Sequence, residues 1–220
     1  MLLLASNSPR RRQLLSLGGW TFKLVPVGVD ENPLAGERAL DYVLRLAAGK
    51  ARSAAARAAP GEVVVAADTT VVDLQPGGET ILGKPVDAQE AGHMLRRLRG
   101  RVHRVCSGIA VLRTFDGLLL TDFCVTEVPM RDYSDEEMQD YIASGDPLDK
   151  AGAYAIQHPG FRPVEALQGC YANVVGLPLC HLTRTLNKLD ISPQEDIPSA
   201  CQSVLHYECP IFHQVLQGDL

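Results

Sequence analysis

A basic, hydroxyl-rich segment near the N-terminus has the residue types of an anion-binding site. Ser6 and Ser8 follow a short apolar run, and Arg10 and Arg11 come directly after Pro9. Serine followed by proline is typical of the first turn of a helix, because serine caps the helix and proline lacks an N–H that would be unbonded there. Arginines on a first turn oppose the helix dipole, so a bound anion explains them better than the alternative, a solvated basic turn.

Asp68 is the second candidate, because a β-branched apolar run over residues 62–67 leads directly to it. The run predicts a buried strand that ends at Asp68, and ligands of α/β proteins bind at the ends of such strands. With Thr69 and Thr70 beside it, the carboxylate could hold a divalent cation or activate a water molecule. A turn or helix cap is the alternative interpretation of the same residues.

Residues 78–84 match G-x-x-x-x-G-K, the pattern of a phosphate-binding P-loop. The next position of a P-loop needs a hydroxyl residue that begins a helix. Pro85 supplies neither a hydroxyl nor an N–H, and it disfavours helical geometry at Lys84. The preceding residues, 73–78, are predicted to form a loop and not a buried strand. We therefore exclude a P-loop and retain Lys84 as an isolated cation beside a turn.

A loop punctuated by glycine and proline, residues 144–157, carries Asp146, Asp149 and Lys150 ahead of a short apolar run. This pattern suits a binding site better than a linker, but the segment taken alone favours a solvated loop. Gln157 ends the run, and its amide group could bind the edge of a nucleobase through one donor and one acceptor.

The remaining patterns predict the elements that must position these residues. Helices are expected over 9–17, 40–58, 88–98, 135–142 and 177–189, and strands over 2–5, 21–29, 62–67, 102–112 and 118–130. Alternating strands and helices indicate an α/β or mixed fold, and the neighbouring strands within 102–130 indicate a sheet that is not purely parallel. Beyond residue 190 the composition becomes polar and proline-bearing. We expect one domain over 1–190 and a peripheral extension over 191–220.

The composition limits the functional classes. A hydrophobic fraction of 46% and a charged fraction of 21% are those of a globular protein. The net charge of −5 argues against a broad nucleic-acid surface but leaves room for a small anionic ligand. The apolar run at the N-terminus is too short for a signal peptide or a membrane span, so we expect a cytoplasmic protein that binds neither nucleic acid nor membrane.

Six cysteines occur without a C-x-x-C pair, and we expect them to be buried and reduced. A zinc site formed by Cys201 and Cys209 with His206 and His213 is the alternative, although this spacing matches no standard zinc finger.

Together, the motifs resemble the Maf-like nucleoside triphosphate pyrophosphatases. The matching segments follow the family's order between residues 2 and 190: 5–11, 47–51, 67–69, 82–85, 145–157 and 173–178. The resemblance implies an α/β fold related to the inosine triphosphate pyrophosphatases. In that fold a mixed sheet is flanked by helices, in two lobes around a central cleft, commonly in a homodimer. It also implies hydrolysis of a nucleoside triphosphate between its α- and β-phosphates, with Mg²⁺ or Mn²⁺.

The resemblance also assigns roles to individual residues. It makes Asp68 the general base or the metal-linked activator of water, with Glu31 as a second acidic group near the metal, although Asp30 could occupy that place. The phosphates would be bound by Ser6, Arg10, Arg11, Lys50 and Lys84.

Specificity is the last expectation that the resemblance supplies. Arg10, Thr69 and Gln157 would choose the base, and they are similar to the branch associated with dTTP and UTP. The branch that acts on 7-methyl-GTP differs. A non-catalytic, nucleotide-binding regulator of septum formation is the alternative function.

Overall fold

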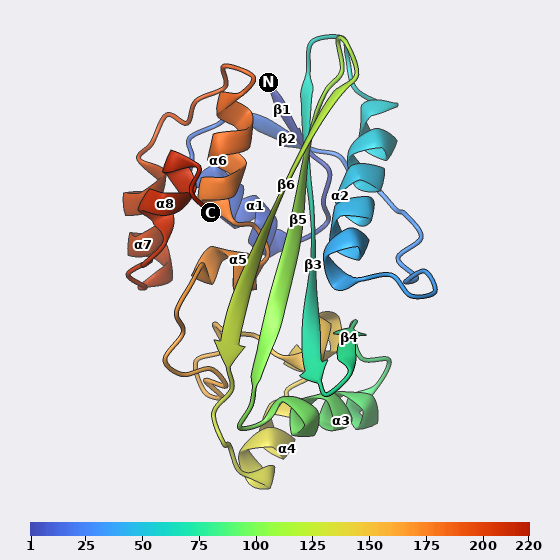
Figure 1. The fold of residues 1–220 in the computed structure, drawn as a ribbon, viewed down its shortest axis with the longest axis vertical. Helices are drawn as coiled ribbons and strands as arrows, with labels where there is room; N and C mark the ends of the chain where they lie inside the picture. Colours follow the sequence, from blue (N-terminus) through green and yellow to red (C-terminus); the bar gives the residue numbers. More distant parts are fainter.

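A mixed six-stranded sheet forms the centre of the molecule in the computed structural model, which describes all 220 residues (Figure 1). Its strands are β1 (Leu2–Leu4), β2 (Phe22–Leu24), β3 (Val63–Gln75), β4 (Gly78–Leu82), β5 (Val102–Arg113) and β6 (Leu118–Pro129). Five of them follow the order β2–β1–β3–β5–β6, and β4 pairs with the far end of β3. Strand β1 is parallel to β2 and β3, whereas β3, β5 and β6 are antiparallel. The predicted mixed sheet is confirmed.

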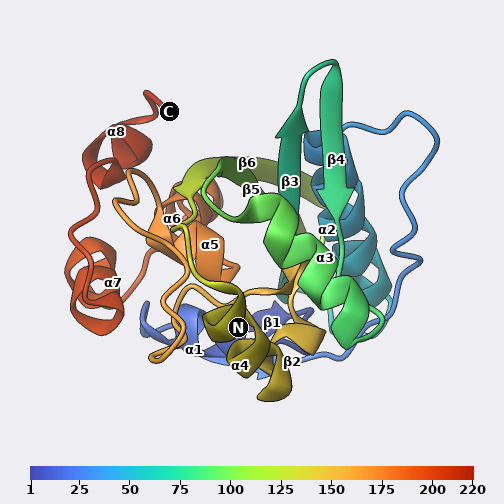
Figure 2. The same cartoon turned by 90° about the horizontal axis from the view of Figure 1, so that it is seen from below.

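Helices cover both faces of this sheet. They are α1 (Pro9–Ser16), α2 (Ala39–Ala55), α3 (Ala88–Leu98), α4 (Asp135–Ala143), α5 (Tyr171–Val175), α6 (Leu179–Asn187), α7 (Ile197–Leu205) and α8 (Phe212–Gln217), with 3₁₀ turns η1 (Asp146–Asp149) and η2 (Ala151–Ala153). Helix α2 lies on one face and α5 and α6 lie on the other, with α7 and α8 outside α6, as Figures 1 and 2 show. None of these helices combines the length and hydropathy needed to span a membrane.

The long strands connect two lobes. In one lobe, alternate residues of β3 enter different cores: Val65 and Ala67 pack on the side of α1 and α6, and Val64 and Ala66 pack beneath α2. This alternation is the period-2 geometry of a strand buried on both faces. The other lobe has its own core at the opposite end of the strands, between α3, α4 and residues 153–167.

Strand β3 differs from its predicted end in a way that creates the cleft. We predicted that the strand stops at Asp68, but it continues to Gln75. Strand β5 pairs with β3 over 63–72, whereas on the other edge β1 pairs only with 63–65 and β4 only with 71–75. Residues 66–70 therefore have no neighbouring strand on that edge. The polar residues after Ala67 did not end the strand, because β5 continues to pair with them.

The predicted loop over 73–78 is also wrong. These residues complete β3 and turn tightly into β4. Gly77 has a φ of +93°, a conformation that glycine adopts without the steric cost of a side chain. The hairpin places Lys84, two residues after β4, beside the gap along β3.

The segment after residue 190 forms α7 and α8 and contributes buried apolar side chains to the core that contains α6. Ile197, Leu205 and Val215 are its buried members. All six cysteines are free thiols, and Cys201 and Cys209 lie in an apolar crevice with Cys170 and Cys180. No three His, Cys, Asp or Glu side chains, these cysteines included, are grouped so that they could hold one metal ion.

Candidate active site

A cleft of about 330 Å³ opens at the gap along β3, between the lobes. The segment 5–11 borders it on one side and the segment 149–157 on the other. All seven side chains expected to bind substrate line it: Ser6, Arg10, Arg11, Lys50, Thr69, Lys84 and Gln157. The structure thus brings together residues that are up to 151 positions apart in the chain.

Lys50 connects the two acidic residues of the site. Its Nζ lies 2.6 Å from Oδ1 of Asp68 and 2.7 Å from Oε1 of Glu31. Asp68 does not line the cleft itself, because its carboxylate lies behind Lys50, with 7% of the residue exposed. Its second oxygen, Oδ2, has no hydrogen-bond partner and is not fully buried, so it can still accept a proton.

Close packing of α2 against the sheet places Lys50 beside Asp68. Gly108 of β5 is the register partner of Asp68, and a Cβ atom at Gly108 would lie 2.6 Å from the backbone oxygen of Val43 in α2. Only glycine allows the helix backbone to come so near. Lys50 follows Val43 by two helical turns and therefore lies on the same helix face, toward the sheet.

The geometry distinguishes Glu31 from Asp30. Glu31 points to Lys50, whereas Oδ1 of Asp30 accepts hydrogen bonds from the backbone and side chain of Asn32. The hydroxyl of Tyr42 donates to the carbonyl oxygen of Glu31 at 2.8 Å and holds that part of the loop. Burial raises the pKa of Glu31, but the hydrogen bond and charge of Lys50 outweigh it, so the pKa lies below its ordinary value.

The start of α1 forms the opposite side of the cleft. Ser8 is the N-cap, and its side chain accepts a hydrogen bond from the backbone of Arg11, as the sequence predicted. The Ser6 side chain accepts from the backbone N–H of Ser8 at 3.1 Å. Free N–H groups at a helix start and the positive end of its dipole favour an anion in this position.

Arg11 is held in place by Thr69, on the other face of β3, and by the backbone of Gly176. Its Nε donates to the carbonyl oxygen of Gly176 at 2.8 Å, and its Nη2 donates to Oγ1 of Thr69 at 3.1 Å. The hydroxyl of Thr69 also lies 2.7 Å from that of Ser107. Consecutive strand residues point to opposite faces, so Asp68 reaches Lys50 and Thr69 reaches Arg11. The hydroxyl of Thr69 is committed to this network.

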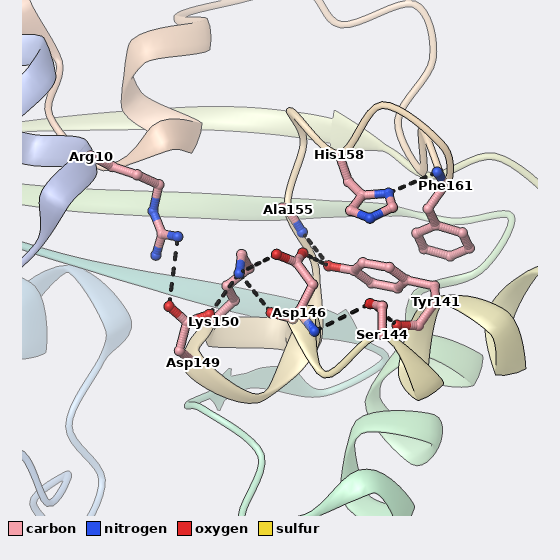
Figure 3. A network of polar contacts seen from close by, with 9 residues as sticks. All are labelled: Arg10, Tyr141, Ser144, Asp146, Asp149, Lys150, Ala155, His158 and Phe161. Carbon is pink, nitrogen blue, oxygen red and sulfur yellow. Dashed lines mark hydrogen bonds and ion pairs between the residues drawn. The ribbon is translucent and has the colours of Figure 1, made fainter.

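The three remaining predicted residues are less constrained. Lys84 and Gln157 are exposed and make no ion pair or side-chain hydrogen bond. Arg10 lies 3.9 Å from Asp149 across the cleft, and Figure 3 shows this pair at one end of a larger network around Lys150. These side chains are free to bind a ligand without losing a strong partner.

A protein-family model matches most of the chain. Residues 1–189 match the family model described as Maf-like protein. The chain belongs to the Maf-like family.

Curated relatives of this Maf-like chain share most of its length. A dTTP/UTP pyrophosphatase of Geobacter sp. (strain M21) is 45% identical over 185 residues, which are 84% of this chain and 93% of that protein. Another, from Anaeromyxobacter dehalogenans (strain 2CP-C), is 48% identical over 189 residues, 85% of this chain and 93% of its own. A solved HAM1 protein of Coxiella burnetii is 17% identical, with a TM-score of 0.40, and the match covers 73% of this chain and 91% of that one.

The acidic pair of this Maf-like chain fits a small divalent cation. Mg²⁺ is usually held by one or two carboxylates together with substrate phosphates and water, not by a complete protein cage. Glu31 lines the cleft, Asp68 lies directly behind Lys50, both carboxylates contact Lys50 Nζ, and no third carboxylate joins them. Lys50 Nζ uses one oxygen of each carboxylate, so a divalent ion would share these two groups with Lys50.

Some residues that line or support the cleft were not assigned a role from the sequence. The hydroxyl of Ser107, the carbonyl of Gly176 and the ring of Tyr154 hold or border the cleft from elements far along the chain. Gly176 and Tyr154 lie inside the matching segments 173–178 and 145–157, which was the only signal available. The only signal for Ser107 was that it stands where the Maf-like family often has threonine, and its role depends on its register opposite Thr69.

Proposed function

We propose that this Maf-like protein is a metal-dependent nucleoside triphosphate pyrophosphatase that converts dTTP or UTP to the monophosphate and pyrophosphate. The observation that carries the proposal is the contact of Lys50 with both Asp68 and Glu31 at a cleft lined by further cations. The relatives described above, both named dTTP/UTP pyrophosphatase, support the substrate class.

Binding of a triphosphate follows from the charges of the cleft. The ligand has about four negative charges at neutral pH and needs cations and amide donors. Arg10, Arg11, Lys50 and Lys84 line the cleft as cations, and Ser6 lies beside the positive end of the dipole of α1. Arginine suits this task because its planar guanidinium group can contact two phosphate oxygens at once.

The reaction itself needs a base near the α-phosphate. A water oxygen forms a bond to the α-phosphorus, the bond from that phosphorus to the bridging oxygen breaks, and pyrophosphate leaves. Asp68 accepts the proton of the water at its free oxygen Oδ2, while Lys50 stays on Oδ1. The cations around the cleft stabilise the charge that develops on the phosphate oxygens.

Glu31 and Asp68 would hold the divalent cation, Mg²⁺ or Mn²⁺. When bound, the ion supplies charge neutralisation of the phosphates and a lower pKa for bound water. Both contributions complement the carboxylate of Asp68.

The base would be recognised in the part of the cleft that Gln157 lines. Gln157 is exposed there, and an amide group offers a donor and an acceptor to the edge of a pyrimidine. We also propose that the protein acts in the cytoplasm, which its six free cysteines support, and that it works as a homodimer. Sedimentation velocity decides the oligomeric state.

The decisive experiment is a release assay with purified protein. Pyrophosphate production is measured with dTTP, UTP, the other common nucleoside triphosphates and modified pyrimidine nucleotides, each with Mg²⁺, with Mn²⁺ and with excess chelator. We expect pyrophosphate, and not inorganic phosphate, from dTTP and UTP, and none with chelator. Binding of these nucleotides without any turnover would overturn the proposal in favour of a non-catalytic regulator.

A further inference from the structure

Tyr141 of α4 lies outside the cleft but makes hydrogen bonds to two segments that border it. Its hydroxyl donates to Oδ2 of Asp146 at 2.7 Å and accepts from the backbone N–H of Ala155 at 2.9 Å. Only 2% of Tyr141 is exposed. Figure 3 shows the side chain pointing from its helix toward both segments.

The ring of Tyr141 holds the far end of the second segment. It stacks on Phe161 with centroids 4.3 Å apart and planes at 12°, and it meets the ring of His158 edge-on at 4.8 Å. Segment 155–161 is thus attached to Tyr141 at its first residue and at its last. Gln157, which lines the cleft, lies between these attachments.

The hydroxyl of Tyr141 also supports the first segment through Asp146. The other oxygen of Asp146 accepts from Lys150 Nζ at 2.9 Å, and Lys150 donates to Asp149 at 2.6 Å. Together with the carbonyl of Asp146, these contacts use all three protons of the ammonium group. Asp149 lies 3.9 Å from Arg10 on the opposite side of the cleft.

The network therefore joins one phenol group to the segment that borders one side of the cleft and, through Asp149, to Arg10 on the other side. Burial, together with the hydrogen bond to Asp146, raises the pKa of Tyr141. The hydroxyl therefore keeps its proton at neutral pH and donates it to Asp146. Its lone pairs remain available to Ala155.

We propose that Tyr141 is a positioning residue for base recognition, because its hydroxyl holds the segments that carry Gln157 and Asp149 at the cleft. The inference rests on the proposed function, since it assigns the part of the cleft lined by Gln157 and Asp149 to the base. Discrimination between bases then depends on a side chain that does not touch the substrate. Phosphate binding at Arg11, Lys50 and Lys84 lies outside the network.

The test compares Tyr141→Phe with a matched control, Tyr133→Phe. Tyr133 is 1% exposed, its hydroxyl donates to the carbonyl oxygen of Leu95 at 2.7 Å, and its ring lies 4.7 Å from Phe161. Each variant loses one buried hydroxyl and keeps its ring, but only Tyr141→Phe loses the bonds to Asp146 and Ala155. Both are assayed for kcat and KM with dTTP, UTP, dATP and dGTP, and for amide hydrogen exchange without nucleotide.

We expect Tyr141→Phe to raise KM for dTTP by about five-fold, the scale of one lost hydrogen bond, with the change falling more on KM than on kcat. The preference for pyrimidine over purine triphosphates decreases in parallel. The amide of Ala155 exchanges about ten-fold faster, because its acceptor is gone. Tyr133→Phe retains the wild-type KM, preference and Ala155 exchange.

Three results would overturn the inference. They are unchanged base preference in Tyr141→Phe, an equal change in both variants, and unchanged exchange at Ala155. If the wild-type protein hydrolyses no nucleotide, the proposed function fails separately. Calorimetric dissociation constants for dTTP and dGTP then replace KM, and an unchanged ratio of the two in Tyr141→Phe overturns the positioning role.

Discussion

The ammonium group of Lys50 lies 2.6 Å from the carboxylate of Asp68, and this contact joins helix α2 to the middle of strand β3. Both residues are less than one tenth exposed. A buried charge needs a partner, and each of these two residues is the other's partner. The pair also keeps one carboxylate oxygen of Asp68 ready to accept a proton.

Replacement of Asp68 by Asn tests the base. Asparagine keeps the size of the side chain but cannot take a proton from water, and we expect kcat to decrease at least about 100-fold. Nucleotide binding, measured by calorimetry, persists because Lys50 still has Glu31 as a partner. Activity within about five-fold of wild type would remove Asp68 from this role.

Glu31 and Asp30 form a natural pair of variants for the metal site. Only Glu31 points to Lys50, so Glu31→Gln should raise the Mg²⁺ concentration for half-maximal rate about ten-fold. Asp30→Asn is the control, since Asp30 bonds to Asn32. A metal titration of initial rates distinguishes them, and equal effects in both variants would contradict the assignment.

Thr69 should act through Arg11 and not through the base. Thr69→Val removes the hydroxyl that accepts from Arg11, and we expect KM to rise about five-fold for every nucleotide. Thr69→Ser keeps the hydroxyl and should restore most of the affinity. If Thr69→Val instead altered only the ratio between bases, Thr69 would contact the base directly.

Glycines at two positions near Lys50 should respond in opposite directions to alanine. Gly108→Ala places a Cβ 2.6 Å from the backbone of Val43 and should lower the free energy of unfolding by about 1–3 kcal/mol. Gly49 lies within α2, and a Cβ atom there would meet no atom closer than Cγ1 of Val29 at 3.6 Å. Gly49→Ala should therefore raise the free energy of unfolding by about 0.5–1 kcal/mol. Urea unfolding measures both, and an undisturbed Gly108→Ala would contradict the close helix packing.

Acid should destabilise the protein partly through His103. Burial lowers the pKa of this side chain from 6.5 to about 4, against the opposing charge of Asp73. The unfolded state binds the proton first, so stability is complete above about pH 6.5 and decreases as the pH falls toward 4. At about 1.4 kcal/mol per pKa unit, the loss is on the order of 3 kcal/mol.

The test of this pH dependence is the slope of stability against pH. His103→Leu should flatten the slope of the unfolding free energy between pH 6.5 and 4, although a contribution of His181, whose pKa is also lowered to about 4, remains. The same slope in the variant and the wild type would show that His103 does not carry the effect.

Local patterns in the sequence predicted the elements whose physics is local. Ser8 and Pro9 begin α1, and Ser134 and Glu137 form the capping box of α4, because a helix start depends on side chains within one turn. The apolar run before Asp68 correctly predicted a buried strand. Spaced motifs also predicted the family, and all the side chains that they indicated as substrate contacts line the cleft.

Tertiary structure decided what depends on distant partners. Strand β3 continues past Asp68 because β5 pairs with it as far as Val72 and β4 pairs with it from Val71 to Gln75. The cleft exists because β1 pairs only with 63–65 and β4 only with 71–75. No local pattern reports such pairing, since the partners come from separate parts of the chain. For the same reason the role of Tyr141 was invisible in the sequence: its hydroxyl contacts lie across two loops that only folding brings to one phenol group.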